Sequence, residues 1–582
     1  MDQLTAPPQS LKDQNLTIAD LLGEIIGRGT RLRTPFGERL MTYADYTASG
    51  RNLRFVESYL GELQEIYGNT HTEDTESGLV TSDLLAQAEE CIKRSVNADD
   101  STCLIATGSG STGAILRFQE LLGLRFPPAT WERLEEALEP HLGNGATQEC
   151  LKERLADRLP VVFVGPYEHH SNEVSWRECF AEVVEVRLTS DGLLDLADLE
   201  AKVADPRYDG RFKIGSFSSS SNVTGIRTPL YEVAKLLHRH GALACFDFAA
   251  SAPYCEIDMN RDDESYFDAI FISPHKYLGG PGSCGVLLFR DDLYRCDLPP
   301  SCSGGGTVDY VGPHDHDYLS DIEEREKAGT PPILQLMRAA LAMDLKETLG
   351  FEAIEATEHR YLEQVMDRFL AHPGIHVLGN PDPRQRMAVI SFNIRHGDKF
   401  LHPKLVARLL NDLFGVQARA GCSCAGPYGH RLLGIDDELS ERYRAQLQAG
   451  FEGIKPGWVR IGLHYTLTTA EIEFLCRSIE MVAEFGSRFL PQYELDMRTA
   501  VWSRRDGFAR PEPAFGIAVA RQERGAAPPA PGEEERNREL ERYLAEAQGL
   551  ADQLADQPEA EYATLPGELE ELRFFNSVSF RL

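Results

Sequence analysis

Between about residues 80 and 350, short runs of apolar and β-branched residues alternate with longer stretches of helical pattern. The candidate strands are Cys103–Ala106, Val161–Val164, Phe212–Phe217, Ala242–Phe246, Ala269–Ile272 and Gly285–Phe289. Most of them are followed by a turn and then by polar or helical sequence. This alternation is typical of a largely parallel sheet with helices on both faces. The sequence therefore predicts an α/β fold in which ligands bind where the strands end.

The chain of 582 residues is too long for one ordinary hydrophobic core, so we expect two or three domains. From about residue 351 the pattern becomes that of a smaller α+β domain, with helices and strands expected at Ile354–Phe369, Val389–Phe392, Val459–Ile461 and Ala470–Phe485. We therefore divide the chain into an N-terminal arm (1–40), a large domain (41–350), a small α+β domain (351–500) and a C-terminal extension (501–582).

The C-terminal extension contains two recognisable parts. Residues Ala526–Gly532 are rich in proline and alanine, which is typical of a stiff, exposed linker. After it, apolar residues recur near helical spacing in a charged background, at Leu540, Leu544, Ala547, Ala551 and Leu554. This pattern predicts an amphipathic helix that packs on the enzyme body or on a partner subunit.

The chain is strongly acidic, with a formal net charge of −32 at pH 7. Nucleic acids and anionic membranes bind basic surfaces, so neither is expected as a partner. The sequence shows no secretory signal and no run of 18 apolar residues. The 12 cysteines are scattered, apart from Cys422 and Cys424, which predicts reduced thiols and a cytoplasmic location.

The segment Ser273–Gly282 places Lys276 between an apolar run and a glycine-rich turn. An amine in a partly desolvated pocket loses its proton more readily and can form a Schiff base with a carbonyl. Ser273 and His275 can donate hydrogen bonds to a phosphate. Together they point to pyridoxal phosphate (PLP), held by its aldehyde and its phosphate. Alone, the segment fits a surface lysine equally well, so the other strand ends decide between the two interpretations.

A glycine- and serine-rich segment follows the first candidate strand and leads into a helical pattern. Glycines let the backbone approach an anion, and free N–H groups at a helix start bind it with the help of the helix dipole. Gly110, Ser111 and Thr112 are therefore candidate phosphate ligands, although a plain helix cap has a similar composition. The segment lacks the Gly-Lys-Ser/Thr of a nucleotide P-loop, which disfavours ATP.

Three further polar residues each follow an apolar strand. His169 can stack on a flat heterocycle and move protons, whereas the His169-His170 pair alone is only a metal half-site. Asn222 carries an amide that can reach a phenolic oxygen. Asp247 closes its strand, and a buried acid needs a partner, for which a protonated pyridine nitrogen is well suited.

The order phosphate loop, Glu168-His169, Ser221-Asn222, Asp247 and Ser-x-His-Lys resembles class V, fold type I PLP enzymes, above all the cysteine desulfurase and selenocysteine lyase group. The likeness runs from about residue 43 to residue 485. It implies a large domain with a mixed, mostly parallel sheet sandwiched by helices, plus a smaller α+β domain. It also implies PLP as cofactor, with Lys276 as Schiff-base lysine, Asp247 on the pyridine nitrogen, His169 stacked on the ring, Asn222 near the ring hydroxyl, and Gly110, Ser111, Thr112, Ser273 and His275 at the phosphate.

The resemblance extends to an amino-acid substrate. Arg460 would bind the α-carboxylate, because its planar fork matches a carboxylate in two hydrogen bonds. Asp45 and His71 lie in segments similar to the family's substrate-access segments. Arg419, Asp45 and His71 are further substrate-binding candidates. Arg419 begins a loop similar to the family's Arg-x-Gly-x-x-Cys-Ala, which implies that Cys424 is the sulfur-accepting cysteine. Cys422 is its possible partner or substitute.

The resemblance also implies partners. Gly305–Thr307 is similar to the loop that adds a phosphate contact from the neighbouring subunit, so Thr307 is a cofactor-binding candidate and a homodimer is expected. A sulfur acceptor protein is the other implied partner. No metal is expected, because Cys422 and Cys424 without a second pair make a poor zinc site.

The leading hypothesis is a PLP enzyme that cleaves the C–S or C–Se bond of L-cysteine or a related amino acid, leaving alanine and a persulfide on Cys424. The sequence departs from the family at Ala250, where a glutamine is usual, and looks longer over residues 126–160 and 425–458. Two alternatives therefore stay open. One is an aminotransferase, β-lyase or epimerase acting on another amino acid, and the other is a non-catalytic scaffold or binding protein.

Overall fold

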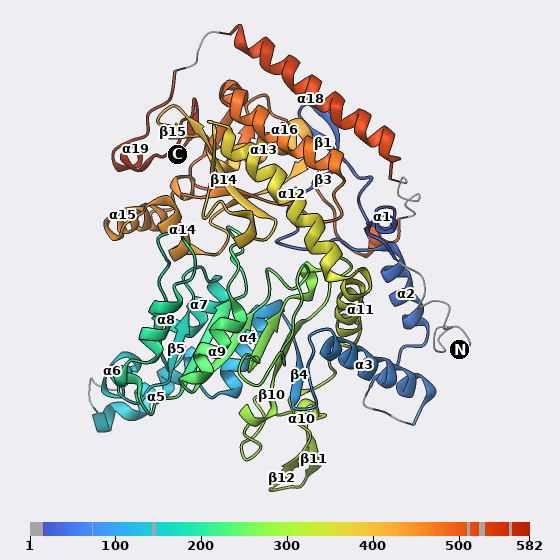
Figure 1. The fold of residues 1–582 in the computed structure, drawn as a ribbon, viewed down its shortest axis with the longest axis vertical. Coiled ribbons are helices and arrows are strands. Elements are labelled where there is room, and N and C mark those ends of the chain that lie inside the picture. The colour runs from blue at the N-terminus through green and yellow to red at the C-terminus, as the bar shows by residue number, and fades with distance from the viewer. Residues whose placement is uncertain are drawn as a thin grey trace.

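The computed structural model describes residues 16–70, 72, 74–142, 147–508, 512–522, 530–557 and 561–582 (Figure 1). Three predictions lie wholly or partly outside these ranges: residues 1–15 of the arm, His71, and residues 526–529 of the linker. All other predicted elements and site residues can be located.

The large domain is built on a seven-stranded sheet with the strand order β4-β10-β9-β8-β7-β5-β6. Its strands are β4 (Thr102–Thr107), β5 (Val161–Val164), β6 (Glu182–Glu185), β7 (Lys213–Ser218), β8 (Ala242–Asp247), β9 (Ala269–Ile272) and β10 (Gly285–Arg290). β10 runs antiparallel to its neighbours β4 and β9, and the other pairs are parallel. The mixed, mostly parallel sheet confirms the predicted fold class.

The strand that the sequence did not reveal is β6, at the edge of this sheet. Its residues, Glu-Val-Val-Glu, are all half-buried. Charged ends interrupt the apolar run by which the central strands are recognised, as is common at sheet edges. β6 nevertheless continues the parallel order, with Val161 opposite Glu182 and Val164 opposite Glu185.

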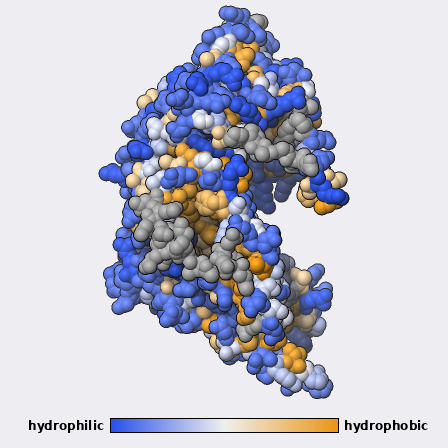
Figure 2. Space-filling view, turned by 90° about the vertical axis from the view of Figure 1, so that its right-hand side faces the viewer, coloured by the Kyte–Doolittle hydropathy of each residue, from blue (hydrophilic) through white to orange (hydrophobic). Residues whose placement is uncertain are grey.

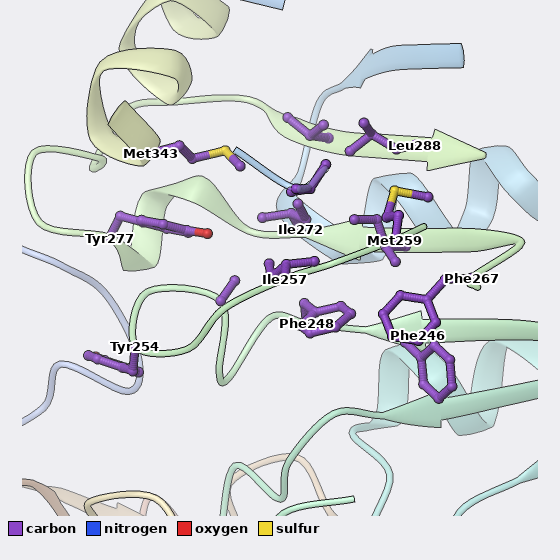
Figure 3. Packing of buried hydrophobic residues seen from close by; sticks show 14 of the residues in the cluster. Phe246, Phe248, Tyr254, Ile257, Met259, Phe267, Ile272, Tyr277, Leu288 and Met343 are labelled. Carbon is purple, nitrogen blue, oxygen red and sulfur yellow. The ribbon is translucent and has the colours of Figure 1, made fainter. Parts of the chain in front are cut away.

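Helices cover both faces of the sheet (Figure 1). The helices of this domain are α3 (Glu76–Arg94), α4 (Gly110–Leu121), α5 (Pro128–Leu142), α6 (Gln148–Arg154), α7 (His170–Arg177), α8 (Leu196–Val203), α9 (Leu230–Arg239), α10 (Ile322–Glu326) and α11 (Ile333–Leu349), of which α5 and α6 lie beside the sheet rather than on a face of it (Figure 1). Successive strand residues point to opposite faces, so Phe271 of β9 packs in one cluster and Ile272 in another. Figure 3 shows the second cluster, where Ile272, Leu288 and Met343 of α11 lie together.

The small domain has a sheet of order β13-β14-β18-β17, with β15 paired to β14. These strands are β13 (Ile375–Val377), β14 (Val389–His396), β15 (Lys399–Phe400), β17 (Arg419–Gly421) and β18 (Trp458–Gly462). Its helices are α12 (Phe351–Ala371), α13 (Pro403–Phe414), α14 (Gly426–Leu433), α15 (Asp437–Gln448) and α16 (Thr469–Phe485). A separate hydrophobic cluster forms its core. This α+β arrangement is also as predicted.

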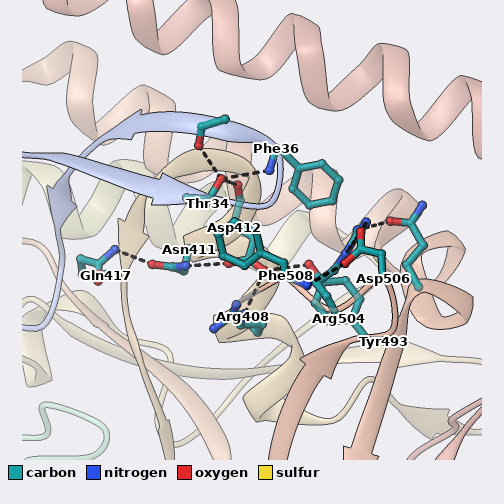
Figure 4. Close-up of polar contacts among 12 residues, drawn as sticks. Thr34, Phe36, Arg408, Asn411, Asp412, Gln417, Tyr493, Arg504, Asp506 and Phe508 are labelled. Carbon is teal, nitrogen blue, oxygen red and sulfur yellow. Dashed lines mark hydrogen bonds and ion pairs between the residues drawn. The ribbon is translucent and has the colours of Figure 1, made fainter. Parts of the chain in front are cut away.

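The N-terminal segment contributes to both domains. Its helices α1 (Ile18–Leu21) and α2 (Arg54–Glu65) pack in the large-domain cluster. Its strands β1 (Arg31–Thr34), β2 (Gly37–Leu40) and β3 (Thr42–Tyr43) lie against the small domain, where β3 pairs in parallel with β16 (Val416–Gln417). Figure 4 shows the polar contacts around buried Asp412 of α13. Its carboxylate accepts hydrogen bonds from Tyr493 Oη (2.8 Å) and Arg408 Nε (2.8 Å), and its carbonyl accepts one from Thr34 Oγ1 (2.8 Å). Asp412 therefore ties the β1–β2 hairpin to α13 and to the strand beginning at Tyr493.

The C-terminal extension packs on the chain's own small domain. Its elements are β19 (Tyr493–Asp496), β20 (Val501–Arg504), α17 (Ile517–Ala520), α18 (Glu533–Ala555), α19 (Glu568–Leu572) and β21 (Phe580–Arg581). Leu540, Ala547 and Ala551 of α18 are buried in the small-domain core, and α18 lies along the outside of that domain (Figure 1). The apolar face of α18 is therefore buried against the chain's own small domain.

The surface is largely polar, in keeping with the acidic composition. Figure 2 shows a mainly hydrophilic face on which hydrophobic residues gather beside a hollow near the middle. All 12 cysteines are free thiols. Within the described part of the chain, every helix is too short or too polar to span a lipid bilayer.

Candidate active site

A pocket of about 230 Å³ lies where the parallel strands of the large domain end. The small domain supplies its other wall, through β17, the loop after it and β18. Among the residues that line it are Ser111, Thr112, His169, Asn222, Asp247, Ser273, His275, Lys276, Arg419, Cys424 and Arg460. The structure therefore gathers most of the sequence-predicted residues, which lie far apart in the chain, around one space.

Lys276 lies in a single helical turn, Pro274–Lys276, directly after β9. Burial lowers the pKa of its amine to about 8, although the nearby Asp247 carboxylate acts in the opposite direction. The glycines that follow are required by the turn, because a Cβ on Gly280 would lie 1.9 Å from the Pro274 carbonyl oxygen. Most of this amine is still protonated at pH 7, but its uncharged fraction, which can react with an aldehyde, is larger than that of an ordinary lysine.

The phosphate-binding candidates lie together at the start of α4. Gly110 adopts the left-handed conformation (φ +57°), and a Cβ there would lie 2.7 Å from Ser273 Oγ. The Ser111 N–H donates a hydrogen bond to Ser273 Oγ (2.8 Å). Burial lowers the pKa of His275 to about 4, so its neutral ring has one N–H to donate. A helix N-terminus lined with hydroxyl and N–H groups is suited to a phosphate.

Two candidates for contact with a cofactor ring lie further along the pocket. Burial, with a smaller effect from Lys276, lowers the pKa of His169 to about 4, so its imidazole is neutral and can stack on a flat ring. Burial raises the pKa of Asp247, whose Oδ1 accepts a hydrogen bond from the Ala249 N–H (2.9 Å). A buried carboxylate of this kind is stabilised by a cationic partner such as a protonated ring nitrogen.

Glu168 is a structural support that sequence reasoning named only as part of a motif. Its carboxylate accepts hydrogen bonds from the Ser218 N–H (2.8 Å) and hydroxyl (2.6 Å) and from Asn172 Nδ2 (2.7 Å). Burial raises its pKa to about 8. These bonds join the ends of β5 and β7 and so hold the neighbouring His169 in place. The signal in the sequence was a carboxylate in the short turn that follows a fully apolar strand.

Two arginines that line the pocket, both predicted to bind the substrate, are joined by one carboxylate. Arg460 is 3% exposed, and it donates to the Asn222 carbonyl (2.8 Å) and pairs with Asp45 Oδ1 (3.2 Å). Arg419 Nε pairs with Asp45 Oδ2 (3.0 Å). Burial lowers the pKa of Arg460, and Asp45 opposes that effect. Asp45 therefore bridges the two guanidinium groups and neutralises part of their charge.

The two cysteines of the loop after β17 face different spaces. Cys424 is exposed and lines the pocket with Lys276, whereas Cys422 lines a second cavity. Ser423 (φ +52°) and Cys424 (φ +56°) are consecutive left-handed residues, which is uncommon outside glycine and costs about 1 kcal/mol or more each. The Asn222 Nδ2 amide donates to the Ser423 carbonyl (2.7 Å), and the His170 N–H to that of Cys424 (2.9 Å). These bonds help to hold the strained loop.

Thr307 is not brought to the pocket. It is buried at the base of the hairpin formed by β11 (Val308–Val311) and β12 (His316–Tyr318), and its Oγ1 donates to the Gly304 carbonyl (2.8 Å). The hairpin projects from the large domain at the bottom of Figure 1. A contact from Thr307 to a phosphate therefore needs a second subunit, as the resemblance implies.

The donors and acceptors of the pocket fit PLP. Three buried oxygens that line it, Asn222 Oδ1, Ser220 Oγ and Ser423 Oγ, have no hydrogen-bond partner among the described residues. Buried polar atoms are nearly always paired, so these three suit a polar ligand. The helix N-terminus matches a phosphate, the Lys276 amine an aldehyde and the Asp247 carboxylate a ring nitrogen. Ser220 was not predicted as a site residue, although it lies in the polar run that follows β7.

The fold and the pocket together define a fold type I PLP-dependent enzyme. The family model for class-V aminotransferases matches residues 148–475, and the chain belongs to this family. It is 30% identical over 333 residues to a probable cysteine desulfurase of Streptomyces coelicolor, covering 56% of this chain and 71% of the relative. It is 29% identical over 392 residues to one of Halalkalibacterium halodurans, covering 66% and 84%.

Solved structures share the fold. The cysteine desulfurase of Thermococcus onnurineus in its apo form matches with a TM-score of 0.60 and 22% identity, over 76% of this chain and 95% of its own. The cysteine desulfurase CsdA of Escherichia coli matches with a TM-score of 0.56 and 20% identity, over 76% and 94%. The family is PLP-dependent, so PLP is the cofactor of this enzyme.

Proposed function

We propose that the chain is a cysteine desulfurase that transfers the sulfur of L-cysteine to Cys424. The observation that carries the proposal is that Cys424, Lys276 and Arg460 line one pocket although they come from three separate loops and strands. A thiol in this position is not needed for transamination, but it is needed to accept sulfur. The names of the two relatives support the same reaction.

In this proposal the arginines select the substrate. The Arg460 guanidinium is buried and already oriented by the Asn222 carbonyl, so it binds an α-carboxylate at a low cost in conformational entropy. Asp45 occupies part of the same guanidinium before substrate arrives. The substrate carboxylate then has to share Arg460 with Asp45 or displace it, which disfavours ligands that lack a carboxylate.

Residues of the pocket then divide the chemistry. When bound there, PLP supplies an aldehyde and an electron-withdrawing ring that stabilises negative charge beside the amino-acid α-carbon. The Lys276 amine, with its pKa near 8, accepts and returns protons at that carbon. The Cys424 thiolate attacks the substrate sulfur, so an S–S bond forms as the C–S bond breaks. The thiol proton ends on the substrate β-carbon, and the products are alanine and a Cys424 persulfide, without an external oxidant or reductant.

The experiment compares two cysteines that are two positions apart in the sequence but line different cavities. PLP-loaded protein is incubated with L-cysteine and dithiothreitol, and alanine and sulfide are measured. We expect Cys424→Ser to lose nearly all sulfide release while keeping its PLP, and the matched control Cys422→Ser to keep most of it. Equal release from wild type and Cys424→Ser would contradict the persulfide step. Loss of release in Cys422→Ser alone would assign the step to the other thiol.

Because Ala250 departs from the family pattern, the test includes a panel of other amino-acid substrates. Ala250 is buried, lines the pocket and offers no side-chain donor where the family usually has glutamine. The ring is therefore held by fewer hydrogen bonds, and the balance between desulfuration and transamination can differ. Selenocysteine, alanine and other amino acids should be assayed beside cysteine. Turnover of another amino acid with no cysteine turnover would favour an aminotransferase, β-lyase or epimerase.

We further propose that the enzyme is a cytoplasmic homodimer that passes its sulfur to an acceptor protein. The position of Thr307 outside the pocket and the exposed Tyr310 and Val311 of the β11–β12 hairpin support a role for that hairpin in the neighbouring subunit. Light scattering of the holoenzyme measures the subunit number. A Tyr310→Asp/Val311→Asp variant should be monomeric and should bind PLP more weakly, and an unchanged dimer would contradict this role of the hairpin.

A further inference from the structure

A second cavity, of about 510 Å³, lies on the opposite side of the cysteine loop from the PLP pocket. Its walls come mainly from α14, α15 and the start of β18, within the stretch 425–458 that looks long in the sequence. This volume is in the range of ligand-binding sites, which run from about 300 to 1,000 Å³. The two cavities have no lining residue in common. The second cavity is therefore a separate space rather than an extension of the active site.

The lining of this second cavity combines apolar walls with positive charge. Leu433, Ile435 and Leu447 supply aliphatic surface, and no Asp or Glu is among the described residues that line it. Lys455 also lines it, and in the described ranges no carboxylate forms an ion pair with its ammonium group. Such an arrangement attracts an anion with an apolar body.

A second observation also indicates a ligand. Trp458, which lines the cavity, is 1% exposed, and its indole N–H has no hydrogen-bond partner among the described residues. An unpaired buried donor is costly, by about 1–3 kcal/mol, unless something accepts from it. The two histidines of the wall are occupied, since His170 Nε2 accepts from the Gly426 N–H (2.9 Å) and His430 Nδ1 binds the Gly426 carbonyl (2.7 Å).

We infer that this cavity binds a small apolar carboxylate. Its carboxylate pairs with Lys455, and its hydrocarbon part lies against Leu433, Ile435 and Leu447. The binding itself does not depend on the reaction proposed for Cys424. Its consequence for the active site does, because Cys422 and Gly426 lie on either side of Cys424 and line the cavity. A bound carboxylate therefore contacts the loop that carries the reactive thiol, and by linkage the state of that loop alters carboxylate affinity.

The position of Cys422 in the cavity wall provides a direct test by chemical footprinting. PLP-loaded protein is alkylated with iodoacetamide at several octanoate concentrations, and the modification of each cysteine is followed by tandem mass spectrometry. We expect octanoate to slow alkylation of Cys422, by about tenfold at ten times its dissociation constant. Exposed Cys296, which lies outside the cavity, is the internal reference and should react at an unchanged rate. Octylamine, with the same chain and the opposite charge, should give no protection.

Two variants with matched controls test the contacts. Lys455→Met should weaken octanoate binding about tenfold, whereas Lys235→Met, which removes a lysine paired with Glu264 at the surface, should not. Leu447→Trp should fill the cavity and abolish protection, whereas Leu370→Trp at an exposed site on α12 should not. Retained PLP shows that each variant is folded. Equal protection by octylamine, no protection by octanoate, or full protection in Lys455→Met would overturn the inference. Because alkylation requires no turnover, these results are independent of whether cysteine is desulfurated.

Discussion

The contact between the C-terminal extension and the body of the enzyme centres on one buried carboxylate. Glu471 of α16 pairs with Arg536 of α18 (2.6 Å) and with Arg28 of the N-terminal segment (2.8 Å). Both side chains of the Arg536–Glu471 pair are almost fully buried, at 4% and 1% exposure. Arg536 also donates to the carbonyls of Arg28 (2.9 Å) and Met41 (3.1 Å). Replacement of Arg536 by methionine keeps the packing volume and removes all of these charge contacts.

The expected loss of stability follows from the burial of Glu471. Removing one partner of a buried ion pair costs about 3–5 kcal/mol, because the other charge stays buried. Arg28 remains as a partner of Glu471, so we expect the lower end, about 3 kcal/mol. For a domain of about 150–250 residues each kcal/mol shifts the melting temperature by about 2–4 °C, so a loss of about 3 kcal/mol lowers it by about 6–12 °C. Arg538→Met, at an exposed position on the same helix, should shift it by less than about 2 °C.

The pH dependence distinguishes a lost charge pair from lost packing. Burial alone would raise the pKa of Glu471, but Arg536 and Arg28 outweigh it and hold the pKa below its usual value of 4.5. The wild-type pair therefore stabilises the fold above about pH 4.5, and that stability is lost as pH falls through the lower folded-state pKa. In Arg536→Met only Arg28 still opposes the effect of burial, so the pKa of Glu471 rises. Its carboxylate is then protonated at a higher pH, and the difference between variant and wild type narrows as pH falls.

The assay is a thermal melt of the holoenzyme, read by circular dichroism and by release of PLP, at pH values from about 7 to 5. We expect the melting temperature of Arg536→Met to lie far below that of wild type at pH 7 and less far below it at pH 5. If Arg536→Met lowers the melting temperature no more than Arg538→Met does, the Arg536–Glu471 pair is not important for stability. A decrease of constant size across this range would refute the electrostatic origin and leave only packing.

Three further predictions concern the active site and its supports. Gly110→Ala should weaken PLP binding at least about tenfold in equilibrium dialysis, because the φ of Gly110 is positive and an added Cβ would lie 2.7 Å from Ser273 Oγ. The control Gly108→Ala, where an added Cβ would meet open space, should have little effect. In apoprotein, the pH dependence of the reductive methylation of Lys276, followed by mass spectrometry, should have its midpoint near pH 8. Asp247→Asn should move this midpoint to lower pH, because the charge of Asp247 favours the protonated amine. An unchanged midpoint would argue against that coupling. Tyr493→Phe should destabilise the small domain by about 1–3 kcal/mol in thermal melts, because Asp412 is fully buried and loses a donor, and a change below about 0.5 kcal/mol would contradict this assignment.

The sequence predicts the fold well where burial is complete and poorly where it is not. β5 and β9 are fully buried, so their apolar runs gave their exact bounds. β6 lies at the sheet edge with half-buried residues, and its pattern did not stand out. The polar residues after β5, β7, β8 and β9 meet in one pocket for a geometric reason, since parallel strands end at the same edge of a sheet.

Contacts that depend on chain folding beyond the strands could not be predicted. Asp45 is hundreds of residues from Arg419 and Arg460 in the chain, and nothing local in the sequence indicates that it bridges them. The opposite directions of Cys422 and Cys424 depend on left-handed backbone at two non-glycine residues, which residue type does not predict. The hairpin beside Thr307 is expected to contact the phosphate site of a neighbouring subunit, and such a contact is not visible in a single chain.

One side chain links the ring contact to the cysteine loop. The family usually places a glutamine at the position of Ala250, so in this chain Asn222 is the remaining amide predicted to contact the ring hydroxyl. The Asn222 Nδ2 amide donates to the Ser423 carbonyl, its Oδ1 is unpaired among the described residues, and its own carbonyl accepts from Arg460. Any movement of the cysteine loop that breaks the bond to Ser423 therefore frees the Asn222 amide next to the cofactor-binding pocket. In this chain the predicted ring contact and the observed bond to the cysteine loop therefore belong to the same side chain.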